Sequence, residues 1–406
     1  MKGILVTLCM FIFLNFNCIL WAKTIKPGTV ITGKNYETYL PELKRLLTSV
    51  LFKHYINGLQ NGWITMPIVK KGDYKSPKGY LEFSDKNADK YKVGKDNVLI
   101  GPTWWGGAPF PDPKNGKELG WNIYRRYDCH REEFHVEPDC NLIDKNGKLE
   151  RSYTNDFFGK KYHARTDTPP IPEVPGNNGF INWKIAMLVT SPFDIKGFVM
   201  LRNQYEDIFK PDDVFSYIPA IRRIRRLTGA DVTDPLMGSD ACYDDFECWQ
   251  QKLGPEIKFG NPENKEILIP SWSSVEVHPE KRTDWIKHNC FQTEWEIRPV
   301  WVLPTDMPLD YAYSRRVFYI EKEMKNYFIF AVDNYDQKGR IWKGAIPFGV
   351  VYQPDKWYLN WHGCIYKTYT NNHTSLYDFN VHGPKFDDPI IPFKYFSVST
   401  LIKLAK

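Results

Sequence analysis

Cysteine is the residue type in this chain with the most specific chemistry, because a thiol can form a disulfide, bind a metal or act as a nucleophile. Six cysteines follow the apolar N-terminal stretch: Cys129, Cys140, Cys242, Cys248, Cys290 and Cys364. An even number of cysteines favours disulfides if the chain is exported, which the N-terminal residues described below predict. Sequence proximity predicts that the first pairs with the second and the third with the fourth, which leaves the last two as a long-range pair.

Two histidines, at positions 130 and 135, lie between the first two of these cysteines. Cysteine and histidine are the usual ligands of zinc, so the segment could be interpreted as a metal site. A disulfide between Cys129 and Cys140 would remove both thiolates. We therefore expect a disulfide here, and neither a metal nor a cofactor.

Four arginines form the most conspicuous cluster of charge: Arg222, Arg223, Arg225 and Arg226. We expect structural ion pairs with Asp240, Asp244 and Asp245, which follow a short way downstream. The alternative is contact with an anionic group such as a lipid phosphate, because the arginine fork matches phosphate oxygens. Nucleic acid is not the expected partner of an exported chain.

Catalytic motifs are absent from the sequence: it has no nucleophile elbow, zinc-protease motif, phosphate loop or dinucleotide-binding motif. The adjacent aspartates at 212–213 and 387–388 would point apart on an extended chain, so neither pair resembles an acid–base dyad. We therefore do not predict an enzyme.

The N-terminal residues 1–22 have the layout of a secretory signal peptide. Lys2 is followed by a mostly apolar run over residues 4–14, and Leu20-Trp21-Ala22 would suit a signal peptidase. The pattern predicts export to an oxidising compartment, most simply the periplasm. Lipidation of Cys18 and an uncleaved anchor are the alternatives.

The composition predicts a large folded body. Of the 406 residues, 42% are hydrophobic and 16% aromatic, which is enough for a sizeable core. The formal net charge of +6 is spread along the chain and is weak support for any acidic partner.

Hydrophobic periodicity predicts one amphipathic helix over residues 41–58, then an irregular region over 62–128. Short strands are possible around 62–69 and 80–83, and the Gly- and Pro-rich loop at 101–113 should pack on the body. Strands are expected at 183–190, 196–205, 214–218, 266–269, 294–303, 315–321, 327–332, 341–351, 358–369 and 396–404. They follow one another without helical crossovers, so the sheet should be antiparallel, with a hairpin turn at 336–339.

Several of the predicted strands carry large aromatic side chains: Trp183, Phe198, Trp295, Trp301, Phe318, Phe328, Phe330 and Trp342. These residues could line a cavity on the concave side of a curved sheet. An ordinary filled core would use the same residues, and both interpretations remain open.

Three passages resemble one family. Pro109-Phe110-Pro111 is followed by Trp121-Asn122, and residues 197–202 and 213–227 precede the segment 234–245. Together they are similar to the DUF1329 family from about residue 101 to the C-terminus. The resemblance implies a fold like that of the LolA and LolB lipoprotein carriers, a curved, incomplete antiparallel barrel closed by helices around an apolar cavity. Many relatives lack these cysteines, so the pairs could be peculiar to a subgroup.

We therefore expect an α+β fold: a large curved antiparallel sheet whose concave face is covered by helices. Residues 23–406 should form a single domain, in which the N-terminal part, 23–100, packs on a β-rich body, 101–406. The resemblance implies a periplasmic carrier of a lipid or other hydrophobic molecule, serving an exporter of the resistance-nodulation-division type or an outer-membrane protein. A carrier would need a cavity of several hundred Å³. The alternatives are a non-catalytic adaptor and a hydrolase or isomerase acting on a hydrophobic envelope substrate.

Overall fold

The computed structural model describes residues 23–126, 132–227, 233–250, 252–271, 290, 292–347, 350–353, 358–361, 363–379 and 396–404. The predicted signal peptide, Cys129 and His130 lie outside the described residues. Within those ranges, no helix is both long enough and apolar enough to cross a membrane.

One large antiparallel sheet dominates the molecule. Its strands are β5 (Glu133–Val136), β6 (Asp139–Ile143), β7 (Leu149–Lys161), β8 (Ile181–Ser191), β9 (Val199–Tyr205), β10 (Asp213–Ile218), β11 (Arg223–Leu227), β12 (Lys258–Phe259), β13 (Glu263–Pro270), β14 (Trp295–Asp306), β15 (Arg315–Glu321), β16 (Ile329–Tyr335), β17 (Ile341–Pro347), β20 (Gly363–Thr368) and β21 (His373–Asp378). Their order is β11-β10-β9-β8-β7-β6-β21-β20-β17-β16-β15-β14-β12, with β13 added beside β14 and β5 beside β7.

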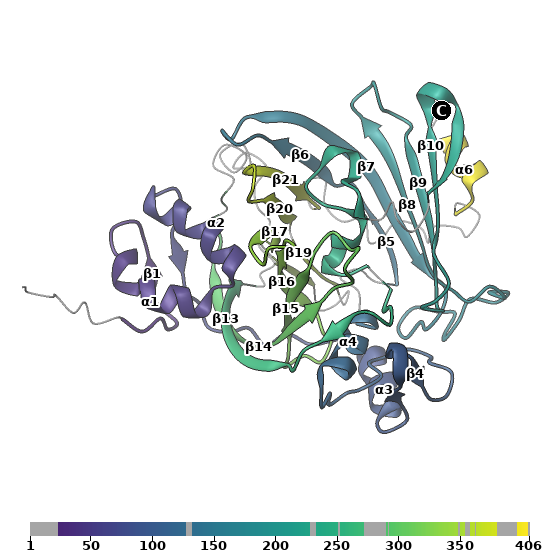
Figure 1. The fold of residues 1–406 in the computed structure, drawn as a ribbon, viewed down its shortest axis with the longest axis horizontal. Coiled ribbons are helices and arrows are strands. Elements are labelled where there is room, and N and C mark those ends of the chain that lie inside the picture. The colour runs from purple at the N-terminus through teal and green to yellow at the C-terminus, as the bar shows by residue number, and fades with distance from the viewer. Residues whose placement is uncertain are drawn as a thin grey trace, which may run out of the picture.

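The sheet curls strongly and stays open (Figure 1). The two ends of the strand order, β11 and β12, do not pair with each other, so the barrel is incomplete. The curled, antiparallel sheet confirms the predicted fold class. The turn at 336–339 is also confirmed: the Asp336 N–H donates to the Arg340 carbonyl (2.9 Å), and Gly339 has a positive φ of 72° that a tight turn requires.

Helices and small two-stranded sheets surround the large sheet. The α-helices are α1 (Tyr36–Leu46), α2 (Ser49–Gln60), α3 (Lys78–Asn87), α4 (Gly116–Tyr124) and α6 (Val398–Leu404), and the 3-10 turns are η1 (Lys95–Asn97), η2 (Pro219–Ile221), η4 (Leu236–Gly238) and η5 (Tyr243–Cys248). The small sheets pair β1 (Val30–Ile31) with β2 (Met66–Pro67), β3 (Lys92–Val93) with β4 (Leu99–Ile100), and β18 (Val350–Gln353) with β19 (Tyr358–Trp361).

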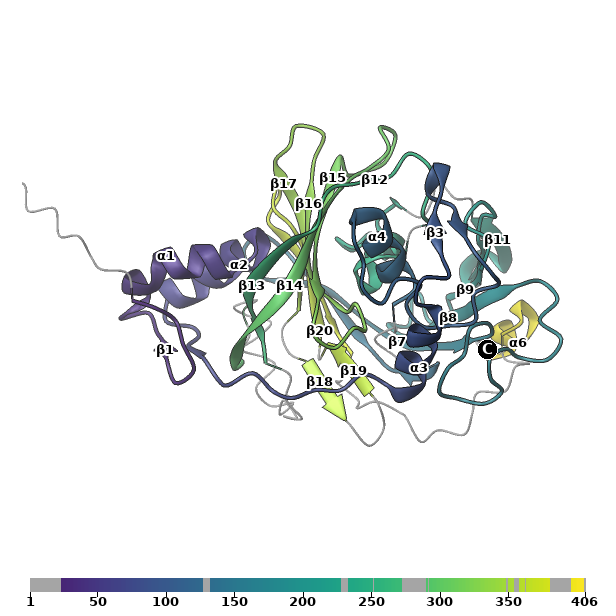
Figure 2. The same cartoon turned by 90° about the horizontal axis from the view of Figure 1, so that it is seen from below.

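The two faces of the sheet are covered by different elements. Figure 2 shows α1 and α2 on one side of β13–β17 and α4 on the other. The turn η5 contacts strands that are far apart in the sheet, because Asp245 pairs with Arg316 of β15 and the Tyr243 ring stacks on Arg202 of β9. Only the inside of the curve can reach both strands. Therefore η5 lies in the concavity, and α1 and α2 lie on the outer face.

The predicted helix over 41–58 is two helices. Thr48 separates them, and its side chain accepts a hydrogen bond from the Leu51 N–H, which is the usual way to start a helix. Pro41 lies inside α1 rather than in the first turn of a single helix. The pair also packs on the outer face of the sheet, whereas we expected it on the concave face.

Two predicted strands are helices. Residues 396–404 are rich in β-branched side chains, yet Ser397 accepts a hydrogen bond from the Thr400 N–H and α6 begins at the next residue. Residues 80–83 lie in α3, which follows Pro77. At α6 the hydrogen bond accepted by Ser397 thus outweighs local strand propensity, whereas α3 has no side-chain cap.

The strands β5, β6 and β7 were not predicted, because their sequence is polar. The long strand β7 carries Arg151, Asp156 and Lys160, and charged residues are depleted in strands. In the sheet these side chains have partners across the strands: the buried Lys160 amine lies 3.0 Å from the Glu133 carboxylate. Cross-strand pairing therefore stabilises a strand that the sequence pattern does not reveal.

Candidate ligand-binding site

A crevice in the concave face is the candidate functional site. It lies where β5, β7, β8 and β9 approach the end of α4, and it contains about 30 Å³ of free space. Its lining combines basic, amide and aromatic side chains: Trp104, Tyr124, Arg125, Arg126, Phe134, Lys161, Asn182, Trp183, Ile185, Gln204, Trp249 and Gln250. This space would hold about two water molecules or a small anionic group. It is far smaller than the several hundred Å³ that we expected.

Arg125 is the most unusual side chain of the crevice. It ends α4, its side chain is only 2% exposed, and one guanidinium nitrogen, Nη2, pairs with the Glu206 carboxylate. The guanidinium lies over the rings of Trp104 (4.3 Å) and Tyr124 (4.8 Å). Within the described chain, Nε and Nη1 have no hydrogen-bond partner although both are buried. Two donors of a buried cation are therefore available to an anion.

Two further cations line the crevice. Arg126 is held by the carbonyl oxygens of Ile123 (2.7 Å) and Trp249 (3.2 Å). Lys161 is 7% exposed, and its amine lies 5.9 Å from the centre of the Trp104 ring. Among the described residues that line the crevice, none is acidic. The site therefore favours negative charge.

The Tyr124 hydroxyl is a neutral donor beside these cations. Burial raises the pKa of Tyr124 well above its ordinary value, and the neighbouring Arg125 offsets only part of that effect. Its hydroxyl has no hydrogen-bond partner among the described residues. The phenol therefore stays protonated at neutral pH and could donate to an anion as well.

Two exposed aromatic rings contact His163, whose own ring lies 6.2 Å from that of the crevice residue Trp104. Trp105 is 39% exposed and Phe180 is 54% exposed. Both rings contact the His163 ring, at 5.2 Å and 6.2 Å between centres, and His163 Nε2 lies 2.9 Å from the Trp104 carbonyl oxygen. A ligand with its polar end in the crevice would therefore find apolar surface at the rim.

The comparisons with known proteins give the family. Residues 30–401 match the model of a family described as "Protein of unknown function (DUF1329)". The chain belongs to the DUF1329 family. An uncharacterized protein of Pseudomonas aeruginosa is 27% identical over 250 residues, which are 58% of this chain and 52% of that protein, so the chain spans about half of that relative's length.

Two solved structures are similar to this DUF1329 protein. One is a DUF1329 family protein from Desulfovibrio piger, with a TM-score of 0.47 and 16% identity, covering 70% of this chain and 97% of the other. The second is a LolA superfamily protein from Nitrosomonas europaea, with a TM-score of 0.42 and 11% identity, covering 71% of this chain and 99% of the other.

The motif that first indicated DUF1329 has a structural role next to the crevice. The Phe110 N–H donates to the Asn122 side-chain oxygen (3.0 Å), and the Asn122 amide donates back to the Phe110 carbonyl (2.6 Å). The Trp121 indole donates to the Asn97 carbonyl (2.8 Å). These bonds fix the loop at 101–113 against α4, a helix that the sequence did not predict, and thereby place Trp104 over Arg125. The motif is the sequence signal that could have located the crevice.

Of the eight predicted cavity aromatics, one lines the crevice. Trp183 of β8 lies there beside Phe134 (6.0 Å between ring centres). Phe318 lies behind the crevice, because its ring packs on Trp249 at 4.8 Å. Trp295 packs on Tyr55 of α2, at the outer face. These three residues therefore serve different parts of the structure.

The other five predicted aromatics pack elsewhere. Phe198 lies at the edge of a cluster that includes Met187 and Met200, Trp342 packs on Tyr313 at 5.5 Å, and Lys322 covers Trp301 at 4.4 Å. Phe328 and Phe330 contact each other at 5.5 Å. Of the eight predicted aromatics, only Trp183 therefore contributes to the crevice, whose lining combines it with other aromatic residues and with cations.

The arginine run forms an exposed edge of the sheet. Arg226 of β11 pairs with Asp213 of β10, and within the described chain the other three arginines have no ion pair. The three aspartates that we expected as their partners are already bonded. Asp240 lies 2.6 Å from His373 Nδ1, Asp245 pairs with Arg316 (3.3 Å), and Asp244 accepts a hydrogen bond from Tyr311 (2.9 Å).

No disulfide joins the cysteines that the structure describes. Cys242 precedes η5, and its sulfur contacts the Asp245 carboxylate at 3.2 Å. The expected disulfide bond to Cys248, at the other end of η5, is not formed. The expected Cys290–Cys364 bond is not formed either, and Cys290 packs closely on Gly58 of α2. Burial raises the pKa of the Cys140 thiol to about 12, which keeps it protonated. Its expected partner, Cys129, lies outside the described residues.

Proposed function

We propose that this protein binds and carries an amphipathic molecule, a lipid or another hydrophobic compound with an anionic group, and that the crevice holds the anionic group. One observation carries the proposal: Arg125 is a buried cation with two guanidinium donors that have no partner among the described residues. Leaving such donors without a partner costs roughly 1–3 kcal/mol each. A carboxylate or phosphate would recover that cost, because its oxygens match the guanidinium fork.

The dimensions of the crevice favour a head group rather than a whole lipid. About 30 Å³ leaves no room for an acyl chain. We infer that the chain lies along the rim, against Trp105 and Phe180, whose rings are exposed. Each methylene group removed from water there contributes roughly 0.8 kcal/mol. No catalytic group is needed for this function.

The place of action is part of the same proposal. The N-terminal sequence has the pattern of a signal peptide, so we infer that the protein works in the periplasm. There it would pass its ligand to an exporter of the resistance-nodulation-division type or to an outer-membrane protein. N-terminal sequencing of the protein isolated from the cell envelope tests the first step, because a mature start near Lys23 is expected.

The ligand is tested in two stages. Organic extraction of the purified protein, followed by mass spectrometry, should release an anionic lipid or a related amphipath. Binding of a fluorescent fatty acid should then weaken at least tenfold in Arg125→Met, because a charge-assisted pair contributes about 1.5–3 kcal/mol. Arg226→Met is the matched control, since Arg226 is an exposed arginine with one carboxylate partner, and it should bind like the wild type.

Three results would count against this proposal. Absence of any co-extracted amphipath together with no fatty-acid binding would remove the carrier and favour the adaptor. Equal binding by Arg125→Met and the wild type would remove the crevice as the head-group site. Chemical conversion of the bound compound would favour a hydrolase or isomerase.

A further inference from the structure

A second cluster of polar side chains lies on the opposite face of the sheet from the crevice. Phe134 of β5 lines the crevice, and His135, the next residue along the strand, points to the other face. On β7, Phe157 contacts Phe134 inside, so its neighbour Asp156 also points outward. The cluster is therefore independent of the proposed ligand site.

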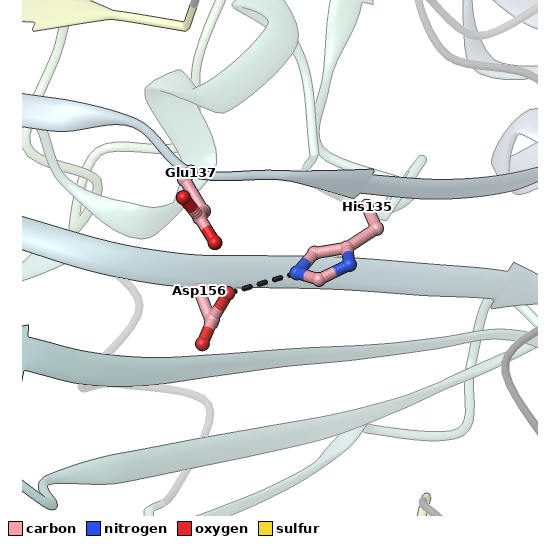
Figure 3. Close-up of side chains that lie close together, drawn as sticks. All are labelled: His135, Glu137 and Asp156. Atoms are coloured by element: carbon pink, nitrogen blue, oxygen red, sulfur yellow. Dashed lines mark hydrogen bonds and ion pairs between the residues drawn. The ribbon is translucent and has the colours of Figure 1, made fainter. Parts of the chain in front are cut away.

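The strand register brings three potential metal ligands together. His135 and Glu137 are two residues apart and share one face, and the pairing of Val136 with Phe157 places Asp156 next to Glu137. Figure 3 shows the three side chains converging from the two strands. His135 Nε2 lies 2.8 Å from an Asp156 carboxylate oxygen, and one ligand atom from each residue lies within 4.8 Å of the others.

These separations suit a single divalent ion. In a tetrahedral zinc site, with metal–ligand distances of about 2.0–2.2 Å, neighbouring ligand atoms are about 3.4 Å apart. The observed 2.8 Å separation and the 4.8 Å upper limit lie on either side of this value. Small side-chain rotations would therefore bring the three ligand atoms into a tetrahedral arrangement. The side chains of His135 and Asp156 are 19% and 27% exposed, so an ion can reach the site from solvent.

His373 provides a comparison within the molecule, because its two carboxylate neighbours do not converge on one ring nitrogen. His373 also contacts two carboxylates, but Asp240 lies at its Nδ1 (2.6 Å) and Glu150 at its Nε2 (3.1 Å). The two nitrogens of an imidazole point in different directions, so these carboxylates cannot share an ion with one nitrogen. At His135, by contrast, both carboxylates lie close to one another and to the ring.

We propose that His135, Glu137 and Asp156 form a binding site for a divalent transition metal, with Zn²⁺ as the ion that fits best. One imidazole and two carboxylates are donors that zinc accepts, and zinc binds such sites more tightly than manganese or ferrous iron does. Three protein ligands leave the fourth position open to water or to another ligand. The ion would tie β5 to β7 at the outer face.

The test is titration of EDTA-treated full-length protein with ZnCl₂ by isothermal calorimetry. The wild type should bind one zinc ion at the site formed by His135, Glu137 and Asp156. His135→Ala, Glu137→Gln and Asp156→Asn should each lower the affinity for that site at least tenfold. His373→Ala is the matched control and should bind like the wild type.

Thermal unfolding provides a second measurement that distinguishes loss of the site from loss of the fold. Added ZnCl₂ should raise the melting temperature of the wild type and of His373→Ala, because an ion that binds only the native state stabilises it. It should leave Asp156→Asn unchanged, although asparagine preserves the size of the side chain. Zinc binding that is equal in the wild type and the three variants would overturn the proposal, as would the absence of binding.

Discussion

The outer and inner faces of the curved sheet are built from different chemistry. On the outer face, α1 and α2 cover β13–β17 with apolar side chains such as Leu46, Val50 and Leu51, all fully buried. Their principal charged contact is with Asp333, which accepts hydrogen bonds from the backbone N–H groups of Ser49 and Val50 (both 3.2 Å) at the start of α2. Apolar packing and one helix-capping carboxylate therefore hold this face.

The inner face buries charge in pairs. Arg316 and Arg202 are 1% and 3% exposed, and they pair with Asp245 and Asp212. Burial alone would raise the pKa of Asp212, but Arg202 and Lys252 more than offset it and hold the pKa below its usual value. Buried pairs contribute little net stability compared with apolar packing. Over β13–β17 the outer face therefore relies on apolar packing, whereas the inner face buries ion pairs, which suits the proposed binding of an anionic group.

The largest effect should follow from breaking a pair on the inner face. Arg316→Met leaves the Asp245 carboxylate buried beside Tyr313 without its cation, which should cost about 3–5 kcal/mol of unfolding free energy in urea. The double variant with Asp245→Asn should recover most of that loss. Arg315→Met, at the exposed neighbour, should change the free energy by less than about 0.5 kcal/mol. Equal losses in the two single variants would remove the distinction between buried and exposed pairs.

An outer-face substitution should reduce stability without affecting recognition. Leu51→Ala in α2 removes a fully buried side chain and should cost about 3 kcal/mol, while fatty-acid binding per folded molecule stays unchanged. Gln60→Ala, at an exposed position of the same helix, is the control and should have a negligible effect. Weakened binding in folded Leu51→Ala would show that the two faces are coupled.

The third effect concerns pH and arises from one buried carboxyl group on the inner face. Burial raises the pKa of Asp244 to about 6, although Arg202, Tyr311 and Arg316 oppose the shift. Because the folded state holds this proton more tightly, the stabilisation is complete below the ordinary pKa of 3.8 and is lost as pH rises through about 6. The wild type should therefore lose up to about 3 kcal/mol from this group over that interval.

Asp244→Asn should remove this contribution to the pH profile of unfolding. The measurement is the melting temperature at pH values from 4 to 8, compared between the variant and the wild type. Identical profiles would mean that Asp244 does not titrate in this interval.

The sequence predicted the outline of the sheet better than its site. Enrichment in β-branched and aromatic residues located strands such as β15, whose predicted bounds of 315–321 match the structure. The strand β7 was missed because its charged side chains are stabilised by partners on β5, which no local pattern reveals. The crevice was missed for a similar reason: Arg125, Lys161 and Trp104 are distant in sequence and meet only after the sheet has curled.

The first strand of the sheet order, β11, has consequences for self-association. Among the described strands it pairs with β10 alone, so its other side presents backbone N–H and C=O groups that could extend into a second molecule. Arg223, Arg225 and Arg226 lie along this strand and are exposed. Two copies meeting edge to edge would bring these positive charges together, and their repulsion would oppose pairing. We therefore expect the run of arginines to oppose edge-to-edge growth of the open barrel into a fibre.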